Sequence, residues 1–135
     1  MSTALGCSPT ILVVDDEPAV INLVKLILDA AGYSVLAASN GQQALALFEN
    51  RSHSIDLLLT DISMPGISGL ELACRVSEAI PQLPVIFMSG CHPESPHIEF
   101  LRRESPFSHC KVIRKPFTPT QLLGEITGTL SAALR

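Results

Sequence analysis

Acidic residues stand at two places in the chain where an apolar run has just ended. Residues 11–14 lead into Asp15 and Asp16, and the mostly apolar run 55–60 leads into Asp61. Carboxylates brought within a few ångströms of one another repel, and a divalent cation relieves that repulsion. Mg²⁺ suits such a cluster because it prefers oxygen ligands and commonly takes one or two carboxylates together with water and phosphate oxygens. A carboxylate of the same cluster could then act as a nucleophile towards phosphorus.

Two further residues extend this chemistry from metal binding to phosphoryl transfer. Lys115 follows the expected strand 111–114 and offers a point charge for the oxygens of a phosphoryl group. Ser89 follows another expected strand, 84–88, and its hydroxyl could donate a hydrogen bond to such an oxygen. Glu17, directly after the acidic pair, is interpreted as an acid at a helix start, where the helix dipole favours negative charge.

These residues can act together only if the fold brings distant parts of the chain to one edge of a sheet. The hydrophobic pattern of the sequence predicts such a fold. Short runs rich in Ile, Leu and Val, typical of strands buried on both faces, alternate with segments of helical periodicity. This alternation predicts a single α/β domain with a five-stranded parallel sheet and five helices on its two faces. The reactive crevice of such a sheet lies at the carboxyl ends of its strands, where the residues above would meet. The expected strands are 11–15, 33–38, 55–60, 84–88 and 111–114, and the expected helices are 18–31, 41–50, 69–80, 96–104 and 119–133.

Composition narrows the class of protein further. The chain has 135 residues and a net charge of −4, which argues against a nucleic-acid-binding surface. Its four cysteines show no paired spacing and no signal peptide precedes them, which predicts a cytoplasmic protein. A zinc site built from Cys91-His92 and His109-Cys110 is disfavoured, because zinc ligands usually come in pairs two to four residues apart. The apolar runs are too short to cross a bilayer, so no membrane association is expected.

Taken in order along the chain, these motifs resemble the receiver domain of bacterial two-component response regulators, such as the chemotaxis regulators. The resemblance covers about residues 10–133, after an arm over residues 1–9 that we expect to be flexible. It implies a flavodoxin-like, doubly wound sheet in the strand order 2-1-3-4-5. It also implies a phosphoacceptor for signal transduction rather than an enzyme, although such domains catalyse their own phosphorylation and dephosphorylation. The matching motifs are Asp15-Asp16, Asp61 with Met64-Pro65 and Gly69, Ser89-Gly90, and Lys115-Pro116-Phe117.

The resemblance assigns a metal site to four residues of this sequence. Asp16 would bind Mg²⁺ directly, and Asp15 would hold a metal-bound water. The carboxylate of Asp61 and the backbone carbonyl of Ser63 would be the remaining protein ligands. Mn²⁺ could replace Mg²⁺ at this site. Asp61 would also be the phosphoacceptor, which receives its phosphoryl group from a phosphohistidine.

The resemblance also implies how the phosphorylated state is reported. Lys115 would pair with the phosphoryl group through a cis Lys115–Pro116 peptide, and the Ser89 hydroxyl would move towards it. Receivers often carry Tyr or Phe three residues before the lysine, but here that position is Val112. A β-branched side chain cannot repeat the swing of an aromatic ring. We therefore expect the switch to run through residues 91–110, which contain three prolines.

The implied partners are proteins. A sensor histidine kinase or a phosphotransfer protein would donate the phosphoryl group, and a downstream protein target would respond to it. The chain begins with Met and ends soon after the last expected helix. This predicts either a stand-alone regulator or a receiver taken from a larger protein or hybrid kinase.

Two other functions stay open on the sequence. A Mg²⁺-dependent aspartyl-phosphate phosphatase or hydrolase usually needs a general acid two residues after its nucleophile, and Ser63 at that position disfavours this function. A receiver-like interaction module that never takes up phosphate is the other alternative. The site residues present together argue against such a decayed site: Asp16, Asp61, Ser89 and Lys115.

Overall fold

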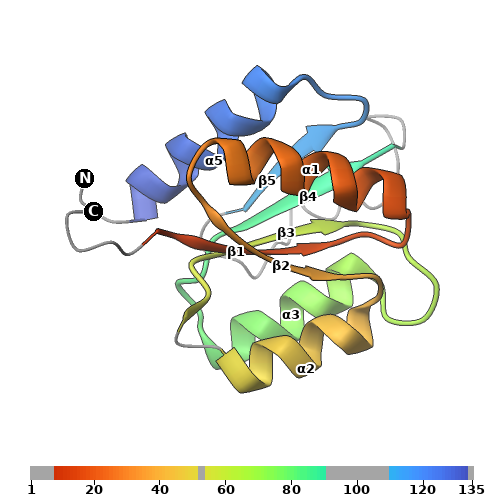
Figure 1. Ribbon diagram of the computed structural model, residues 1–135. Helices are drawn as coiled ribbons and strands as arrows, with labels where there is room; N and C mark the ends of the chain where they lie inside the picture. Colours follow the sequence, from red (N-terminus) through yellow and green to blue (C-terminus); the bar gives the residue numbers. More distant parts are fainter. Residues whose placement is uncertain (1–7, 52–53, 91–109, 134–135) are drawn as a thin grey trace.

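The computed structural model describes residues 8–51, 54–90 and 110–133, which form five strands and four helices (Figure 1). The predicted helix 96–104 and nearly all of the predicted switch segment 91–110 lie outside the described residues, as do residues 1–7 of the predicted arm. Of the disfavoured zinc site, Cys91, His92 and His109 also lie outside them. The strands are β1 (Thr10–Val14), β2 (Ser34–Ala38), β3 (Leu57–Asp61), β4 (Val85–Ser89) and β5 (Cys110–Arg114). The helices are α1 (Pro18–Ala30), α2 (Gly41–Arg51), α3 (Gly69–Ala79) and α5 (Pro119–Ala133).

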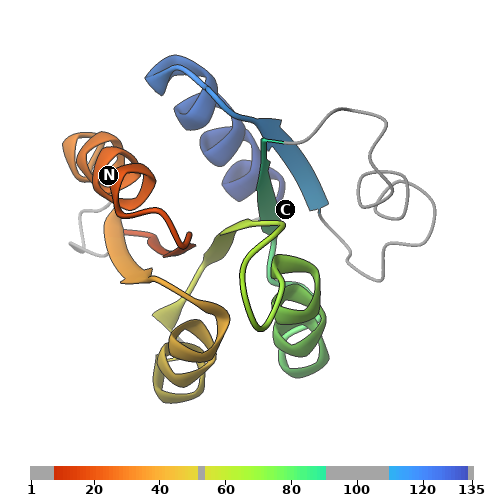
Figure 2. The same ribbon diagram turned by 90° about the vertical axis from the view of Figure 1, so that its right-hand side faces the viewer.

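All five strands are parallel and follow the order β2-β1-β3-β4-β5. The two views agree that α1 and α5 cover one face of the sheet while α2 and α3 cover the other (Figures 1 and 2). This confirms the flavodoxin-like fold and the strand order that the sequence motifs implied. In such a sheet β1 and β3 lie side by side at the centre, so their carboxyl ends share one edge.

The core consists of two apolar layers, one on each face of the sheet. Side chains of a strand alternate between faces, so Leu12 and Val14 join the layer under α2 and α3. Ile11 and Val13 join the layer under α1 and α5. All residues of β3 are buried, which explains why its sequence is almost continuously apolar before it reaches an aspartate.

The strand boundaries differ slightly from those expected, and the difference concerns the site. Strand β3 covers Leu57–Asp61 rather than 55–60, so Asp61 is its last residue and pairs in register with Met88 of β4. Strand β1 ends at Val14, and Asp15 follows it. Hydrogen bonding between strands decides these limits, and hydrophobicity alone does not report it.

Two helix ends have clear causes in the local sequence. Gly32, just after α1, adopts a φ of 93°, a left-handed conformation that glycine tolerates better than other residues. At the start of α5, the Gln121 backbone N–H donates to Thr118 Oγ1 at 3.1 Å, and the Thr118 N–H donates to Gln121 Oε1 at 2.9 Å. This reciprocal pair is a capping box, and it fixes where the chain turns after Lys115. Among the described residues, no helix combines the length and apolarity needed to span a bilayer.

Candidate functional site

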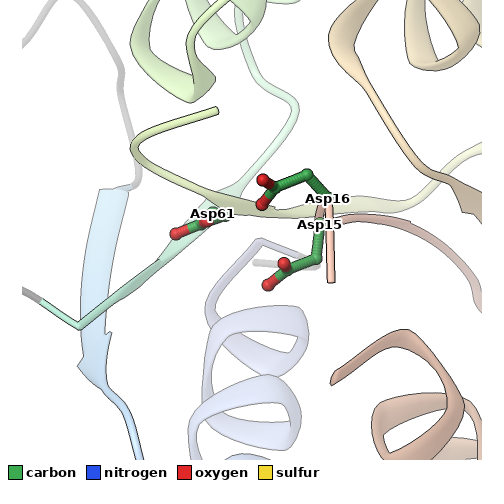
Figure 3. Close-up of side chains that lie close together, drawn as sticks. All are labelled: Asp15, Asp16 and Asp61. Carbon is green, nitrogen blue, oxygen red and sulfur yellow. The ribbon is translucent and has the colours of Figure 1, made fainter. Parts of the chain in front are cut away.

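Three aspartates meet at the carboxyl edge of the two central strands (Figure 3). Asp15 and Asp16 follow β1, and Asp61 ends β3, so the parallel pairing of these strands brings them together. Each offers a carboxylate oxygen, and these oxygens lie within 4.8 Å of one another. The grouping predicted from the sequence is therefore present.

The three carboxylates differ in their contact with solvent. Asp15 is fully buried and Asp61 is 9% exposed, whereas Asp16 is exposed. The cluster is thus open on the side of Asp16 and closed on the side of Asp15. A cation and its waters could approach from the Asp16 side without any rearrangement of the core.

Asp15 is held by two hydrogen bonds that use both of its oxygens. The backbone N–H of Glu17 donates to Oδ1 at 2.9 Å. Lys115 Nζ donates to Oδ2 at 2.7 Å. A buried carboxylate needs such partners, and here they also fix the orientation of Asp15.

Lys115 enters the site from the end of β5. Its backbone N–H donates to the Ser89 carbonyl at 2.8 Å, and the peptide bond to Pro116 is cis, as the resemblance implied. The side chain is 17% exposed, and Nζ lies 3.6 Å from Asp61 Oδ1 and 3.8 Å from Glu17 Oε1. The cation therefore faces the acidic cluster, and its closest partner is Asp15.

The crowded charges change the ionisation of Asp61. Burial raises the pKa of Asp61, and the neighbouring charges of Asp15 and Asp16 raise it further. The charge of Lys115 and a backbone hydrogen bond from Ile62 act in the opposite direction. The net result is a pKa of about 6 in place of 3.8, so the metal-free site resists a third negative charge.

The pKa of Lys115 is also raised. Partial burial of its ammonium group lowers this pKa, but the hydrogen bond to Asp15 and the charges of Asp61 and Glu17 outweigh that effect. Lys115 is therefore a stable cation at neutral pH, as the neutralisation of phosphoryl oxygens requires.

The remaining predicted residues occupy the places expected from their strands. Ser89 is buried at the end of β4, and Ser63 is exposed in the segment between β3 and α3. Val112 is half-buried in β5 and packs against the layer under α2 and α3. The roles assigned to Ser89, Ser63, Val112 and Pro116 stay predictions.

Sequence reasoning missed one participant. Glu17 was interpreted only as a helix-start acid, but it precedes α1, orients Asp15 through its N–H and places its carboxylate 3.8 Å from Lys115. Its spacing of two residues from Asp15 was a possible signal, because an aspartate side chain commonly accepts a hydrogen bond from the N–H two residues later.

Comparison with known proteins agrees with this geometry. The family model described as the response regulator receiver domain matches residues 11–127. Response regulator GtcR of Aneurinibacillus migulanus is 36% identical over 126 residues, which are 93% of this chain and 49% of that protein. The phosphate regulon transcriptional regulatory protein PhoB of Pseudomonas aeruginosa is 36% identical over 123 residues, or 90% of this chain and 51% of PhoB.

The chain thus spans about half the length of these two curated relatives. Among solved structures, a CheY-like response regulator receiver domain protein from Methanospirillum hungatei JF-1 matches with a TM-score of 0.83 and 29% identity. That match covers 93% of this chain and 96% of the other. The chain belongs to the family of response regulator receiver domains of two-component systems.

Proposed function

We propose that this chain accepts a phosphoryl group on Asp61 in a Mg²⁺-dependent reaction and thereby changes its affinity for a protein partner. One observation carries the proposal: oxygens of Asp15, Asp16 and Asp61 lie within 4.8 Å of one another, with Lys115 Nζ 3.6 Å from Asp61. Three carboxylates and one ammonium group suit a divalent cation together with a phosphoryl group. Receiver domains as a family serve in two-component signalling, which agrees with this chemistry.

The donor set fits Mg²⁺, or Mn²⁺ in its place, because all three side chains offer hard oxygen atoms. Asp16 and Asp61 would bind the ion, with Asp15 acting through a water and Ser63 through its backbone carbonyl. When bound, the ion supplies positive charge that offsets the carboxylates and the oxygens of the incoming phosphoryl group. The exposed Asp16 leaves a path for the ion to enter.

Three residues of the chain would each have a separate role in the transfer of the phosphoryl group. A carboxylate oxygen of Asp61 forms a bond to phosphorus as the phosphorus–nitrogen bond of the donor phosphohistidine breaks, and the released imidazole takes a proton from solvent. With a pKa of about 6, Asp61 is mostly ionised at neutral pH even without metal. Lys115 neutralises charge on the transferred oxygens, and Ser89 would donate a hydrogen bond to one of them.

The alternatives have less support from the site. Ser63, two residues after Asp61, is exposed and carries a hydroxyl, which cannot serve as the general acid of a phosphatase at neutral pH. A pure interaction module would have no need for a buried carboxylate such as Asp15 paired with Lys115.

Metal-dependent phosphorylation by a small-molecule donor tests the proposal. Incubation with acetyl phosphate and Mg²⁺ is expected to add one phosphoryl group per chain, measured by intact-mass spectrometry. Excess chelator should prevent the addition, because Asp61 would then face Asp15 and Asp16 without a neutralising ion. Uptake that continues in chelator, or addition at several sites at once, would contradict the proposal.

A sensor kinase or phosphotransfer protein is the proposed donor, and an apolar surface beside the site suits a protein of this kind. A cavity of about 350 Å³ is lined by Val20, Leu23, Lys115, Pro116 and Phe117, so it lies between the chain that follows β5 and the side of α1. Leu23 is 48% exposed, and Leu26 one turn further along α1 is 69% exposed. A donor that delivers a phosphohistidine to Asp61 would cover this surface.

Leu23→Ala is therefore expected to slow phosphorylation by a protein donor without slowing phosphorylation by acetyl phosphate. Loss of one buried leucine contact corresponds to a loss of donor affinity between about tenfold and about a hundredfold, since its burial stabilises by about 1.5 to 3 kcal/mol. The two rates are measured side by side, with whichever phosphorylated sensor kinase labels the wild type fastest. Equal slowing with both donors would mean that Leu23 acts on the site and not on docking.

A further inference from the structure

The segment that follows Asp61 is packed unusually closely at its far end. Residues 62–68 join β3 to α3 and include Ser63, whose carbonyl is a proposed metal ligand. Ile62 and Met64 are buried, whereas Ser63 is exposed. The path of this segment decides where the Ser63 carbonyl lies relative to the aspartates.

Gly69 fixes the end of the segment that adjoins α3. Its N–H donates to the Ile62 carbonyl at 2.8 Å. A Cβ at Gly69 would lie 1.8 Å from the Asp61 carbonyl oxygen and 2.8 Å from the Asp61 carbonyl carbon. The first turn of α3 therefore rests directly on the peptide group of Asp61, and only a residue without a side chain fits there.

A second close contact comes from a different part of the chain. Gly41 is the first residue of α2 and is buried, and a Cβ there would lie 2.7 Å from Ile67 Cβ and 3.0 Å from both Ile67 Cγ2 and the Ile67 carbonyl oxygen. The start of α2 is itself fixed, because the Gln43 N–H donates to Asn40 Oδ1 at 2.8 Å. The segment 62–68 is thus held between α3 at Gly69 and α2 at Gly41.

We infer that Gly41 is a positioning residue for the acidic site. By leaving room for Ile67, it holds the segment 62–68 in the path that presents the Ser63 carbonyl to a metal ion beside Asp61. Gly41 has no side chain and so contributes no side-chain ligand to the cluster. The inference rests on the proposed Mg²⁺ site and adds α2 to the elements that determine its affinity.

The test compares Mg²⁺ affinity with the stability of the metal-free protein. Gly41→Ala is expected to weaken Mg²⁺ binding about tenfold or more, the usual effect of disturbing residues that orient metal ligands. The variant should still fold, because alanine favours helices more than glycine does. Calorimetric titration gives the dissociation constant, and thermal unfolding in chelator gives the stability. The matched control is Gly124→Ala in α5, where an added Cβ has no neighbour within 4 Å and Mg²⁺ affinity should not change.

Ile67 provides a second route to the same conclusion. Ile67→Ala removes Cγ2, loosens the contact from the other side and should also weaken Mg²⁺ binding, so the inference stays testable if Gly41→Ala does not fold. Combining Gly41→Ala with Ile67→Gly moves the Cβ from one side of the contact to the other. The double variant should then lose less Mg²⁺ affinity than the sum of the losses in the two single variants. Wild-type affinity in Gly41→Ala or Ile67→Ala, or full additivity in the double variant, would overturn the inference. A wild type that binds no Mg²⁺ would overturn the proposed metal site as well.

Discussion

Replacing Asp61 by asparagine is expected to abolish phosphoryl uptake from acetyl phosphate. The rate should fall by more than about a hundredfold, since a side-chain amide cannot replace a carboxylate as the nucleophile. Asp15 cannot take over this role, because it is fully buried and both of its oxygens are already hydrogen-bonded, to Glu17 and Lys115. Asp61, in contrast, keeps 9% of its surface exposed and lies near the same lysine.

The matched control is an aspartate at the opposite end of the same strand. Asp56 precedes β3 and accepts a hydrogen bond from the Thr10 N–H at 2.8 Å, far along the strand from the acidic cluster. Asp56→Asn should therefore be labelled like the wild type. Intact-mass spectrometry over a time course measures both variants, and peptide mapping locates the group. Wild-type labelling of Asp61→Asn would remove Asp61 from the role of phosphoacceptor.

The same Asp61→Asn substitution is expected to stabilise the metal-free protein at neutral pH. The pKa of Asp61 is raised from 3.8 to about 6, so the folded state binds this proton more tightly than the unfolded state does. Ionisation of Asp61 therefore costs stability, and the cost grows as the pH rises from about 4 to about 6 and is complete above that range. A shift of this size corresponds to about 2 kcal/mol when some solvent screening of a partly exposed group is allowed for.

Urea unfolding in chelator at pH 4 and pH 7.5 measures this effect. Asp61→Asn should exceed the wild type in free energy of unfolding at pH 7.5. The difference should be much smaller at pH 4, where Asp61 is protonated in the folded state and already close to half protonated in the unfolded chain. Added Mg²⁺ should reverse the order at pH 7.5, because an ion that binds only the folded state stabilises it by mass action. Asp16→Asn should likewise lose most of the stabilisation by Mg²⁺. If Mg²⁺ stabilises Asp16→Asn as much as the wild type, the ion binds elsewhere.

The proposed route of the switch stays a prediction. The sequence favours residues 91–110 because Val112 replaces the usual aromatic side chain, and residues 91–109 lie outside the described part of the chain. The half-buried Val112 packs with the layer under α2 and α3, in keeping with a residue that belongs to the core.

The sequence by itself determined the class of fold and which acidic residues gather at the carboxyl edge of the sheet. Periodicity is a local property, so the alternation of strands and helices could be found without knowing their partners. The acids at the ends of β1 and β3 could be assigned to one edge because parallel strands next to each other must end there. The spacing of Thr118 and Gln121 also indicates a capping box, because the two residues lie on the same helical turn.

Only the tertiary structure decided how these groups are paired and held. Lys115 bonds Asp15, 100 residues away, at 2.7 Å and lies at 3.6 Å from Asp61, although charge alone would allow either arrangement. Asp15 is buried while its neighbour Asp16 is exposed, because the chain turns away from the sheet between them. The close contact of Gly41 with Ile67 joins α2 to the segment after β3. Such contacts depend on how the elements pack in three dimensions. Hydrophobic periodicity and residue spacing along the chain do not specify the distances between side chains of different elements.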